Sequence, residues 1–421
     1  MRRNQIVSVF TVLALAAALV CIGGPLGNSA LAKKSKKKDP PSFQVLYSFA
    51  GETADGSYPA GSLIRSGTIL YGMTYYGGTY TTTTVTSIVN PYGFGTIFEY
   101  NTSTGKELVL HSFGGEVEVS GVETQDGYNP AYGSLIRSGT TLYGMTYEGG
   151  TEDYGTIFSY STQTGTYKLL YSFQGGTSDG SYPYGSLTLS GETLYGMTEE
   201  GGYDNKGTIF AFNVTTGKEM LLHSFCGDGE KPYGSLVLSG KTLYGMTYNG
   251  GYDDEGTIFA INRQNGEFTV LHQFWQYDGS YPWGSLTLSG TTLYGMTSNG
   301  GEYNYGTIFA LNTENGELTT LYSFQGGTSD GREPYGNLIL SGTTLYGMTY
   351  EGGYDDEGTI FAFNLTTGKE TLLHSFTRAT TVPYDGAYPY GSLTLSETTL
   401  YGMTWEGGEY DYGVIFSYSL E

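Results

Sequence analysis

The sequence predicts an all-β fold, a β-propeller of seven blades with four antiparallel strands in each. Three observations predict it: three short motifs each occur seven times, each repeated unit divides into four short strands, and the two ends of the chain together complete one unit. Glycine and tyrosine are abundant, at 67 and 41 of 421 residues, a composition typical of strands joined by tight turns. The repeated region shows no helical period.

The three motifs fix the period of the repeat. Leu-Tyr-Gly-Met-Thr starts at Leu70, Leu142, Leu194, Leu243, Leu293, Leu345 and Leu400. Gly-Thr-Ile-Phe starts at Gly95, Gly155, Gly207, Gly256, Gly306 and Gly358, with a seventh, variant copy at Gly413. Leu-(Tyr/His)-Ser-Phe occurs first at Leu46–Phe49, ahead of any complete unit, and its one variant is Leu271–Phe274. Seven units of about fifty residues follow from this spacing.

The third unit illustrates the four strands. Ser186–Leu189 alternates and ends at a Ser-Gly turn, and Thr193–Thr198 returns from that turn. Thr208–Phe212 is the third strand and Lys218–Phe225 is the fourth. Four antiparallel strands per unit are typical of a propeller blade.

The ends of the chain predict how the ring closes. Gln44–Phe49 reads as a fourth strand without its unit, and Gly413–Ser419 reads as a third strand without a successor. Pairing the two removes two open sheet edges at once. We therefore expect a domain over 43–421, with repeats at 55–113, 126–173, 179–225, 228–274, 278–324, 330–376 and 385–416 plus 43–49.

The first 32 residues predict export. Arg2 and Arg3 precede the apolar run Val7–Ile22, and Ala30-Leu31-Ala32 places small residues where a signal peptidase cuts. We expect a signal peptide over 1–32 and a secreted or cell-surface protein. A lipoprotein signal at Cys21 ranks second, because Val20 fits that signal poorly, and an uncleaved anchor ranks third.

A basic linker follows over 33–42, beginning with the run Lys33–Lys38. Such a run cannot bury its side chains, so a solvated linker is the simpler interpretation. A tether to an anionic polymer of the cell envelope is the alternative.

The charge of the repeated region restricts its partners. Seven of the 19 basic residues and one of the 41 acidic residues precede Ser42, which leaves 12 basic and 40 acidic residues, a net charge of −28. This balance excludes nucleic acid and suits cations or neutral sugars. After cleavage only Cys226 remains, so no intrachain disulfide can form. We expect a monomer with no transmembrane span in the mature chain.

The repeat resembles a known family. The string Gly-Ser-Leu-x-Leu-Ser-Gly-x-x-Leu-Tyr-Gly-Met-Thr-x-x-Gly-Gly, then Gly-Thr-Ile-Phe-Ala-Phe-Asn and Thr-Gly-Lys, is similar to the GloVer tandem repeat over residues 43–421. The resemblance implies a propeller-like, exported bacterial protein of no established activity. The unit is also similar to kelch repeats through the Gly-Gly after its second strand.

Seven aspartates are the first candidate site residues. The motif Asp-Gly-x-x-Pro occurs in every unit, at Asp55, Asp126, Asp179, Asp228, Asp278, Asp330 and Asp385. Turn formation explains each of them singly. Together, seven carboxylates at one mouth of a propeller channel suit a hard cation such as calcium, although no stretch has the spacing of a known calcium loop. No other cofactor is expected.

Aromatic residues after the repeated proline are the second set. They are Tyr184, Tyr233, Trp283, Tyr335 and Tyr390, with Tyr132 one residue later in the second unit and Ala60 in the first. Packing between blades is the simpler interpretation, and a ring of flat platforms for sugar rings is the alternative. Two enlarged loops, Tyr75–Phe94 and Gly114–Gln125, fall on the same predicted face.

No catalytic residue stands out. The four histidines, His111, His223, His272 and His374, share one position of the fourth strand and form no ligand cluster. We therefore expect a non-catalytic surface or extracellular binding module, with polysaccharide or cell-envelope polymer as its partner and the acidic, aromatic-rich loop face as its ligand face. A carbohydrate-active hydrolase or lyase with carboxylates at the channel mouth is the alternative.

Overall fold

The computed structural model describes residues 42–51, 55–79, 92–119, 122–130 and 132–420. The predicted signal peptide and nearly all of the predicted linker lie outside them. Ser42, the last residue of that linker, is the first residue of a strand. Within the described residues the chain is all-β, and no helix is long and apolar enough to cross a membrane.

Four-stranded antiparallel sheets dominate, one for each repeat. The first three are β3 (Ile64–Ser66), β4 (Ile69–Thr74), β6 (Thr96–Asn101) and β7 (Lys106–Ser112); β10 (Ile136–Ser138), β11 (Thr141–Thr146), β13 (Thr156–Ser161) and β14 (Thr166–Ser172); and β15 (Gly180–Ser190), β16 (Thr193–Gly201), β17 (Thr208–Asn213) and β18 (Lys218–Ser224). The next two are β19 (Val237–Ser239), β20 (Thr242–Thr247), β21 (Thr257–Asn262) and β22 (Phe268–Gln273); and β23 (Thr287–Ser289), β24 (Thr292–Thr297), β25 (Thr307–Asn312) and β26 (Leu318–Ser323). The last two are β28 (Ile339–Ser341), β29 (Thr344–Thr349), β31 (Thr359–Asn364) and β32 (Lys369–Ser375); and β34 (Thr394–Ser396), β35 (Thr399–Thr404), β37 (Val414–Ser419) and β1 (Ser42–Ser48).

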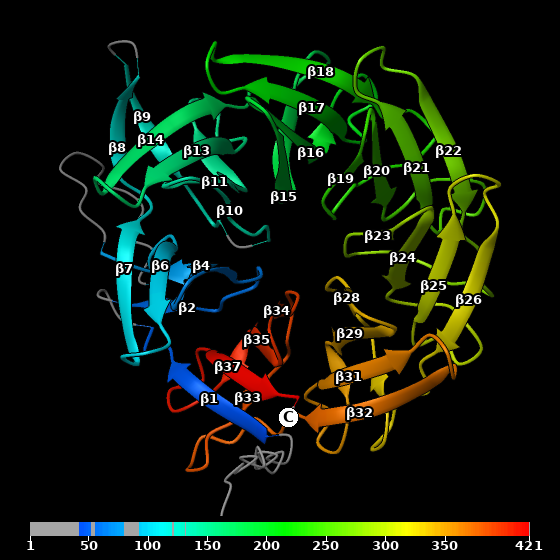
Figure 1. Cartoon of the computed structure of the whole chain (residues 1–421). Helices are drawn as coiled ribbons and strands as arrows, with labels where there is room; N and C mark the ends of the chain where they lie inside the picture. The colour runs from blue at the N-terminus through cyan, green and yellow to red at the C-terminus, as the bar shows by residue number, and fades with distance from the viewer. Residues whose placement is uncertain (1–41, 52–54, 80–91, 120–121, 131, 421) are drawn as a thin grey trace, which may run out of the picture. The chain divides into compact units, whose positions relative to one another are not determined.

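The sheets of residues 42–420 are arranged around a common centre, with the first strand of each sheet innermost and the fourth outermost (Figure 1). The sheet of the last repeat takes its outer strand from the other end of the chain. Strand β1 pairs antiparallel with β37, and Phe43 lies opposite Tyr418 and Val45 opposite Phe416.

Small sheets join the segment before the first strand of a repeat to the loop after its second strand. They are β2 (Gly56–Ser57) with β5 (Tyr76–Gly77), β27 (Gly331–Arg332) with β30 (Glu351–Gly352), and β33 (Gly386–Ala387) with β36 (Glu406–Gly407). In the third repeat the same pairing is continuous with the main sheet, which makes β15 longer than the sequence predicts. In the second repeat, β8 (Glu116–Val119), β9 (Val122–Tyr128) and β12 (Glu148–Gly150) form a three-stranded sheet from the enlarged junction Gly114–Gln125.

The core lies between neighbouring sheets. One cluster joins Met197, Ile209 and Phe225 of the third repeat to Leu243 and Phe259 of the fourth, all almost fully buried. The glycine of Leu-Tyr-Gly-Met-Thr makes room for this packing, since a Cβ on Gly245 would lie 2.4 Å from the ring of Phe259. The repeated motifs therefore encode the contacts between sheets as well as the strands.

Candidate functional site

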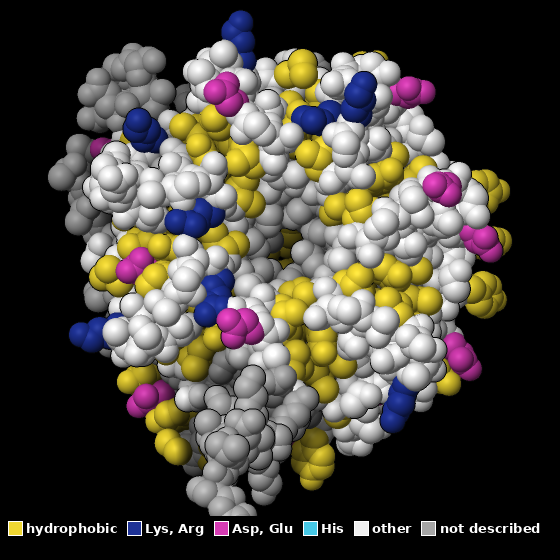
Figure 2. Space-filling view, viewed as in Figure 1, with side chains coloured by type: hydrophobic (Ala, Val, Ile, Leu, Met, Phe, Trp, Pro, Cys, Tyr) yellow, Lys and Arg dark blue, Asp and Glu magenta, His cyan; other side chains and the backbone are white. Residues whose placement is uncertain are grey.

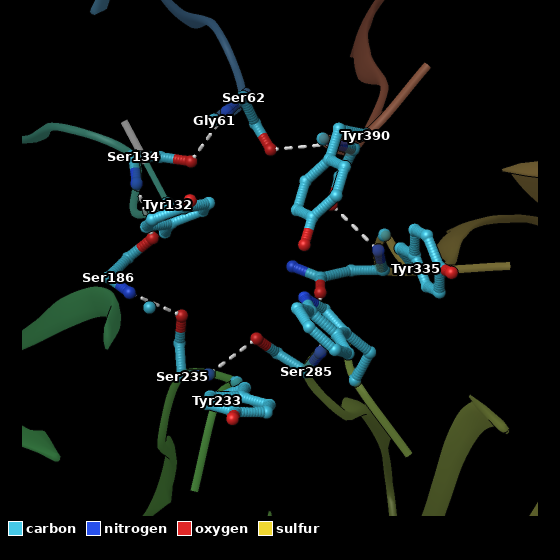
Figure 3. Close-up of a pocket in the computed structure, with 18 of the residues that line it drawn as sticks. Gly61, Ser62, Tyr132, Ser134, Ser186, Tyr233, Ser235, Ser285, Tyr335 and Tyr390 are labelled. Carbon is cyan, nitrogen blue, oxygen red and sulfur yellow. Dashed lines mark hydrogen bonds between the residues drawn. The ribbon is translucent and has the colours of Figure 1, made fainter. Parts of the chain in front are cut away.

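The aromatic residues after the repeated proline converge at the centre of the described residues (Figure 3). Neighbouring ring centroids are 4.3 Å apart for Tyr132 and Tyr184, 4.6 Å for Tyr184 and Tyr233, and 4.5 Å for Tyr233 and Trp283. Trp283 to Tyr335 and Tyr335 to Tyr390 each span 5.2 Å. The Tyr184 and Tyr390 hydroxyls approach to 3.3 Å across the centre.

A closed cycle of hydrogen bonds surrounds the same centre. The backbone N–H two residues after each aromatic position donates to a side-chain oxygen of the next repeat, over 2.5 to 2.9 Å. The donors and acceptors, in order, are Ser62 to Ser134, Ser134 to Ser186, Ser186 to Ser235, Ser235 to Ser285, Ser285 to Asn337, Asn337 to Ser392, and Ser392 back to Ser62. The glycine before each serine allows this approach, since a Cβ on Gly234 would lie 2.2 Å from the Gly284 carbonyl oxygen.

The central cluster leaves little open space. The rings and the serine cycle line a central cavity of about 40 Å³, far smaller than the sites that bind small ligands. The indole Nε1 of Trp283 is buried and has no hydrogen-bond partner among the described residues. Burial raises the pKa of Tyr184 and of Tyr390 well above the usual tyrosine value, so both hydroxyls stay protonated. The predicted platforms therefore face one another in a packed cluster, and no sugar ring fits between them in this arrangement.

A carboxylate interrupts the aromatic surroundings of this cluster. The position after Met-Thr is aromatic in most repeats, but it is Glu199 in the third. The Glu199 carboxylate accepts hydrogen bonds from the Tyr147 hydroxyl at 2.7 Å and the Tyr233 hydroxyl at 3.0 Å, and Lys231 lies 3.5 Å away. The Glu199 carboxylate is therefore already engaged by two tyrosines and a lysine.

The seven predicted aspartates lie outside the central cavity and hold neighbouring repeats together. The Tyr47 hydroxyl donates to Asp55, and the corresponding bonds join Tyr171 to Asp179 and Tyr322 to Asp330. In the other four repeats a histidine Nε2 lies about 3 Å from the carboxylate. These pairs are His111 with Asp126, His223 with Asp228, His272 with Asp278, and His374 with Asp385.

The same carboxylates also cap backbone groups. Asp179, for example, accepts from the N–H groups of Gln174 and Gly180, both at 2.7 Å. This is the turn-forming role that the sequence allowed for each aspartate. Their hydrogen bonds thus place these aspartates in turns and in the contacts between repeats. Among the described residues no group of three or more His, Cys, Asp or Glu side chains could hold a metal ion.

The loops between second and third strands lie against the Asp-Gly-x-x-Pro segments. The N–H of Tyr182 donates to the Tyr154 carbonyl, Tyr281 to Glu255, and Tyr388 to Glu357. Each of these bonds joins the loop of one repeat to the aspartate segment of the next. We call these loops and segments together the loop face.

The exposed tyrosines on this face were not among the site residues that the sequence predicted. They follow the repeated Gly-Gly in five repeats, and they are Tyr203, Tyr252, Tyr303, Tyr354 and Tyr410. The exposed fraction is 76% for Tyr203, 91% for Tyr252 and 74% for Tyr354. Each of them has an acidic residue directly before or after it, as in Glu302-Tyr303 and Tyr252-Asp253-Asp254-Glu255. The signal that could have found them is the regular placement of an aromatic residue inside a polar loop.

Basic side chains lie mainly on the short turns between strands. Exposed Arg65 and Arg137 precede turns between first and second strands, and exposed Lys106, Lys218 and Lys369 begin fourth strands. Figure 2 shows one face of the molecule, with Lys and Arg as well as Asp and Glu side chains around a narrow central opening. The short turns thus carry both signs of charge, whereas acidic residues cluster in loops such as Tyr354-Asp355-Asp356-Glu357.

Fold and site together define an all-β, β-propeller-like repeat protein. The chain belongs to the Gloeobacter/Verrucomicrobia repeat family, which matches residues 80–259 and 243–421, and the resemblance seen in the sequence is thereby confirmed. No curated protein sequence matches the chain.

Among solved structures, an oligogalacturonate lyase in complex with manganese is similar, with a TM-score of 0.54 and 13% identity over 91% of this chain and 98% of that one. A second oligogalacturonate lyase, from Vibrio parahaemolyticus, has a TM-score of 0.52 and 9% identity over 90% and 97% of the two chains. At these identities the likeness concerns the fold alone, and it supports the β-propeller-like architecture.

Proposed function

We propose that residues 43–421 form a closed seven-bladed β-propeller that is exported and binds neutral polysaccharide through its loop face, without catalysis. One observation carries this proposal: exposed tyrosines recur on the Gly-Gly loops of successive repeats, each beside acidic side chains. An exposed aromatic ring offers a flat apolar surface to the C–H face of a sugar, and neighbouring carboxylates accept its hydroxyl protons. Repetition then adds avidity from individually weak contacts.

The pairing of β1 with β37 and the cycle of seven hydrogen bonds at the centre support the closed ring. The excess of acidic residues supports a neutral ligand over an anionic one. Oligogalacturonate, named for the structurally similar lyases, is anionic and suits such a surface poorly.

The engagement of the candidate carboxylates supports binding over catalysis. Each Asp of Asp-Gly-x-x-Pro contacts a tyrosine or histidine of the preceding repeat, and Glu199 is held by two tyrosines. A general acid or nucleophile must instead reach the substrate. The hydrolase or lyase alternative would show itself as cleavage of the polymer in the binding experiment.

Binding can be measured by affinity electrophoresis of the mature protein in gels containing a neutral β-glucan or polygalacturonate, with and without calcium. We expect retardation by the neutral polymer alone. Replacing Tyr203, Tyr303 and Tyr354 with alanine, one after another, should weaken binding by about 2- to 10-fold at each step. These side chains are exposed, so the melting temperature should not change.

Matched controls are Lys106→Ala, Lys218→Ala and Lys369→Ala on the turns between third and fourth strands. Retardation that disappears in the lysine variants and survives in the tyrosine variants would refute the assignment of the ligand face. Release of new reducing or unsaturated ends from either polymer would favour the enzyme alternative.

Export is tested separately. Protein recovered from the culture medium or the periplasm should begin at Lys33, as determined by N-terminal sequencing, because Ala30-Leu31-Ala32 precedes that residue. A lipid-modified N-terminus at Cys21 would instead establish the lipoprotein alternative.

A further inference from the structure

The junction between the fourth and fifth repeats departs from the repeat at two positions. The residue before the last phenylalanine of the Leu-(Tyr/His)-Ser-Phe motif is serine in six copies and Gln273 in this one. The residue after that phenylalanine is Trp275, where other copies have small or polar residues such as Ala50, Gln174 or Cys226.

The two substitutions act at one place. In other repeats the serine hydroxyl accepts a hydrogen bond from the Gly-Gly loop, for example from the N–H of Tyr203 to Ser224 at 2.6 Å. Here the Gln273 Oε1 accepts the corresponding bond from the Tyr252 N–H at 2.8 Å. Gln273 is exposed and this bond uses only its Oε1, so its Nε2 remains as a solvent-facing donor beside the loop.

The Trp275 side chain is exposed, and its backbone is held in a tight turn. Its exposed fraction is 58%, yet its backbone is held in a tight turn, because its N–H donates to the Asp278 carboxylate at 3.1 Å and its carbonyl accepts from the Asp278 N–H at 3.0 Å. His272 in turn lies 2.9 Å from Asp278. Fixing the backbone that carries this exposed side chain reduces the entropy lost when a ligand binds.

A cleft lies between the two exposed rings. Its volume is about 330 Å³, and Tyr252, Asp253, Gln273, Phe274 and Trp275 line it. This volume is at the lower end of the range for small-ligand sites. No lysine or arginine is among the lining residues.

We propose that this cleft, which we call the Tyr252–Trp275 cleft, is a saccharide subsite for one neutral hexopyranose unit. The two rings face the C–H surfaces of the sugar, the Asp253 carboxylate accepts protons from its hydroxyl groups, and the Gln273 amide donates to a hydroxyl oxygen. A uronate or a phosphorylated sugar would place its charge beside Asp253 without a compensating cation. The inference rests on the proposed function, since it names the strongest subsite of the same loop face.

Binding of short oligosaccharides distinguishes this subsite from the many weak contacts of the loop face. Neutral tetrasaccharides of β-linked glucose and of mannose, with tetragalacturonate as the anionic probe, are titrated into the mature protein by calorimetry. We expect binding of a neutral tetrasaccharide, a loss of tenfold or more in affinity with Trp275→Ala or Tyr252→Ala, and a smaller loss with Gln273→Ser, which restores the residue of the other repeats.

The matched control is Tyr277→Ala, which removes an exposed tyrosine of the same junction that does not line the cleft. It should change the affinity for the tetrasaccharide less than twofold. Tetrasaccharide binding that survives Trp275→Ala would overturn the subsite and leave the proposed function standing, as would neutral-polymer retardation with no tetrasaccharide binding. Preference for tetragalacturonate, or no neutral glycan bound in either assay, would overturn both.

Discussion

A chain that starts at Ala50 is expected to lose at least about 5 kcal/mol of unfolding free energy relative to one that starts at Ser42. The truncation removes strand β1, its ladder with β37, and Phe49, which is fully buried. Loss of one buried phenylalanine side chain alone costs about 3–5 kcal/mol. Phe43 and Val45 pack with Phe416 and Tyr418 in the core of the last repeat, so their loss adds to this cost.

The same strand also joins the last repeat to the first. The Tyr47 hydroxyl donates to Asp55, and the Tyr100 hydroxyl donates to the Leu46 carbonyl at 3.1 Å. Truncation therefore exposes an unpaired edge on β37. It also removes these contacts between the last repeat and the first repeat.

Urea unfolding followed by tryptophan fluorescence measures the effect. The chain that starts at Ser42 is the control, because it lacks the same preceding residues and keeps β1. Equal unfolding midpoints and slopes for the two chains would contradict closure by β1.

The strands were predictable because the same strand motifs occur in all seven repeats. The third strand of the third repeat was predicted at Thr208–Phe212 and β17 is Thr208–Asn213; the fourth was predicted at Lys218–Phe225 and β18 is Lys218–Ser224. A repeated motif averages away local ambiguity, and the alternation within each copy fixes which side chains face the neighbouring sheet.

The direction of individual side chains at the centre was not predictable. A period places Tyr184, Trp283 and Tyr390 at equivalent positions, but it does not say whether they point outward as platforms or inward against one another. That depends on how closely the innermost strands approach, and the serine cycle sets this distance. The exposed Trp275 depends on one repeat departing from the others, and an argument from the shared period does not detect such a departure.

A correlation between neighbouring repeats could have been read from the sequence. Where the fourth strand carries tyrosine, as at Tyr47, Tyr171 and Tyr322, the second position of the next fourth strand is glutamate: Glu107, Glu219 and Glu370. Where it carries histidine, the equivalent position, four residues before the next Tyr or His, is apolar or aromatic. Phe43, for example, stacks on His374 with centroids 3.8 Å apart. Two kinds of contact therefore join the fourth strands of neighbouring repeats, and we call these contacts seams. The kind that contains tyrosine also contains the carboxyl group of a glutamate.

The pKa of each seam glutamate is raised to near or above neutrality. Burial, and next the negative charge of Asp55, raise the pKa of Glu107 to about 8. Burial and Asp179 raise the pKa of Glu219 to about 7, and burial and Asp330 raise that of Glu370 to about 7. In all three the Oε1 atom is buried and has no hydrogen-bond partner among the described residues, which favours the neutral form.

The sign of the pH dependence follows from these pKa values. A carboxyl group whose pKa is raised on folding binds its proton more tightly in the folded state, so its contribution to stability is complete below the unfolded value, about 4.3, and is lost as the pH rises through 7 to 8. After discounting for the partial exposure of the three groups, their combined effect is about 4 kcal/mol. Asp356 and Asp411 have the opposite effect on stability, because hydrogen bonds from Arg332 and Arg378 lower their pKa. Their contribution to the unfolding free energy is lost as the pH falls and they become protonated.

We therefore expect the unfolding free energy to be greatest near pH 5 and to fall between pH 5 and 8, as measured by urea unfolding at each pH. The triple variant Glu107→Gln, Glu219→Gln, Glu370→Gln, which mimics the protonated side chains, should flatten this decline and be more stable than the parent chain at pH 8. Glutamine at the exposed Glu152, Glu192 and Glu314 is the matched control and should leave the slope unchanged. An unfolding free energy that rises from pH 5 to 8 would contradict the raised pKa of the seam glutamates. An equal decline in the triple variant would contradict it too. Either result would mean that these carboxyl groups ionise in the folded protein as freely as they do in water.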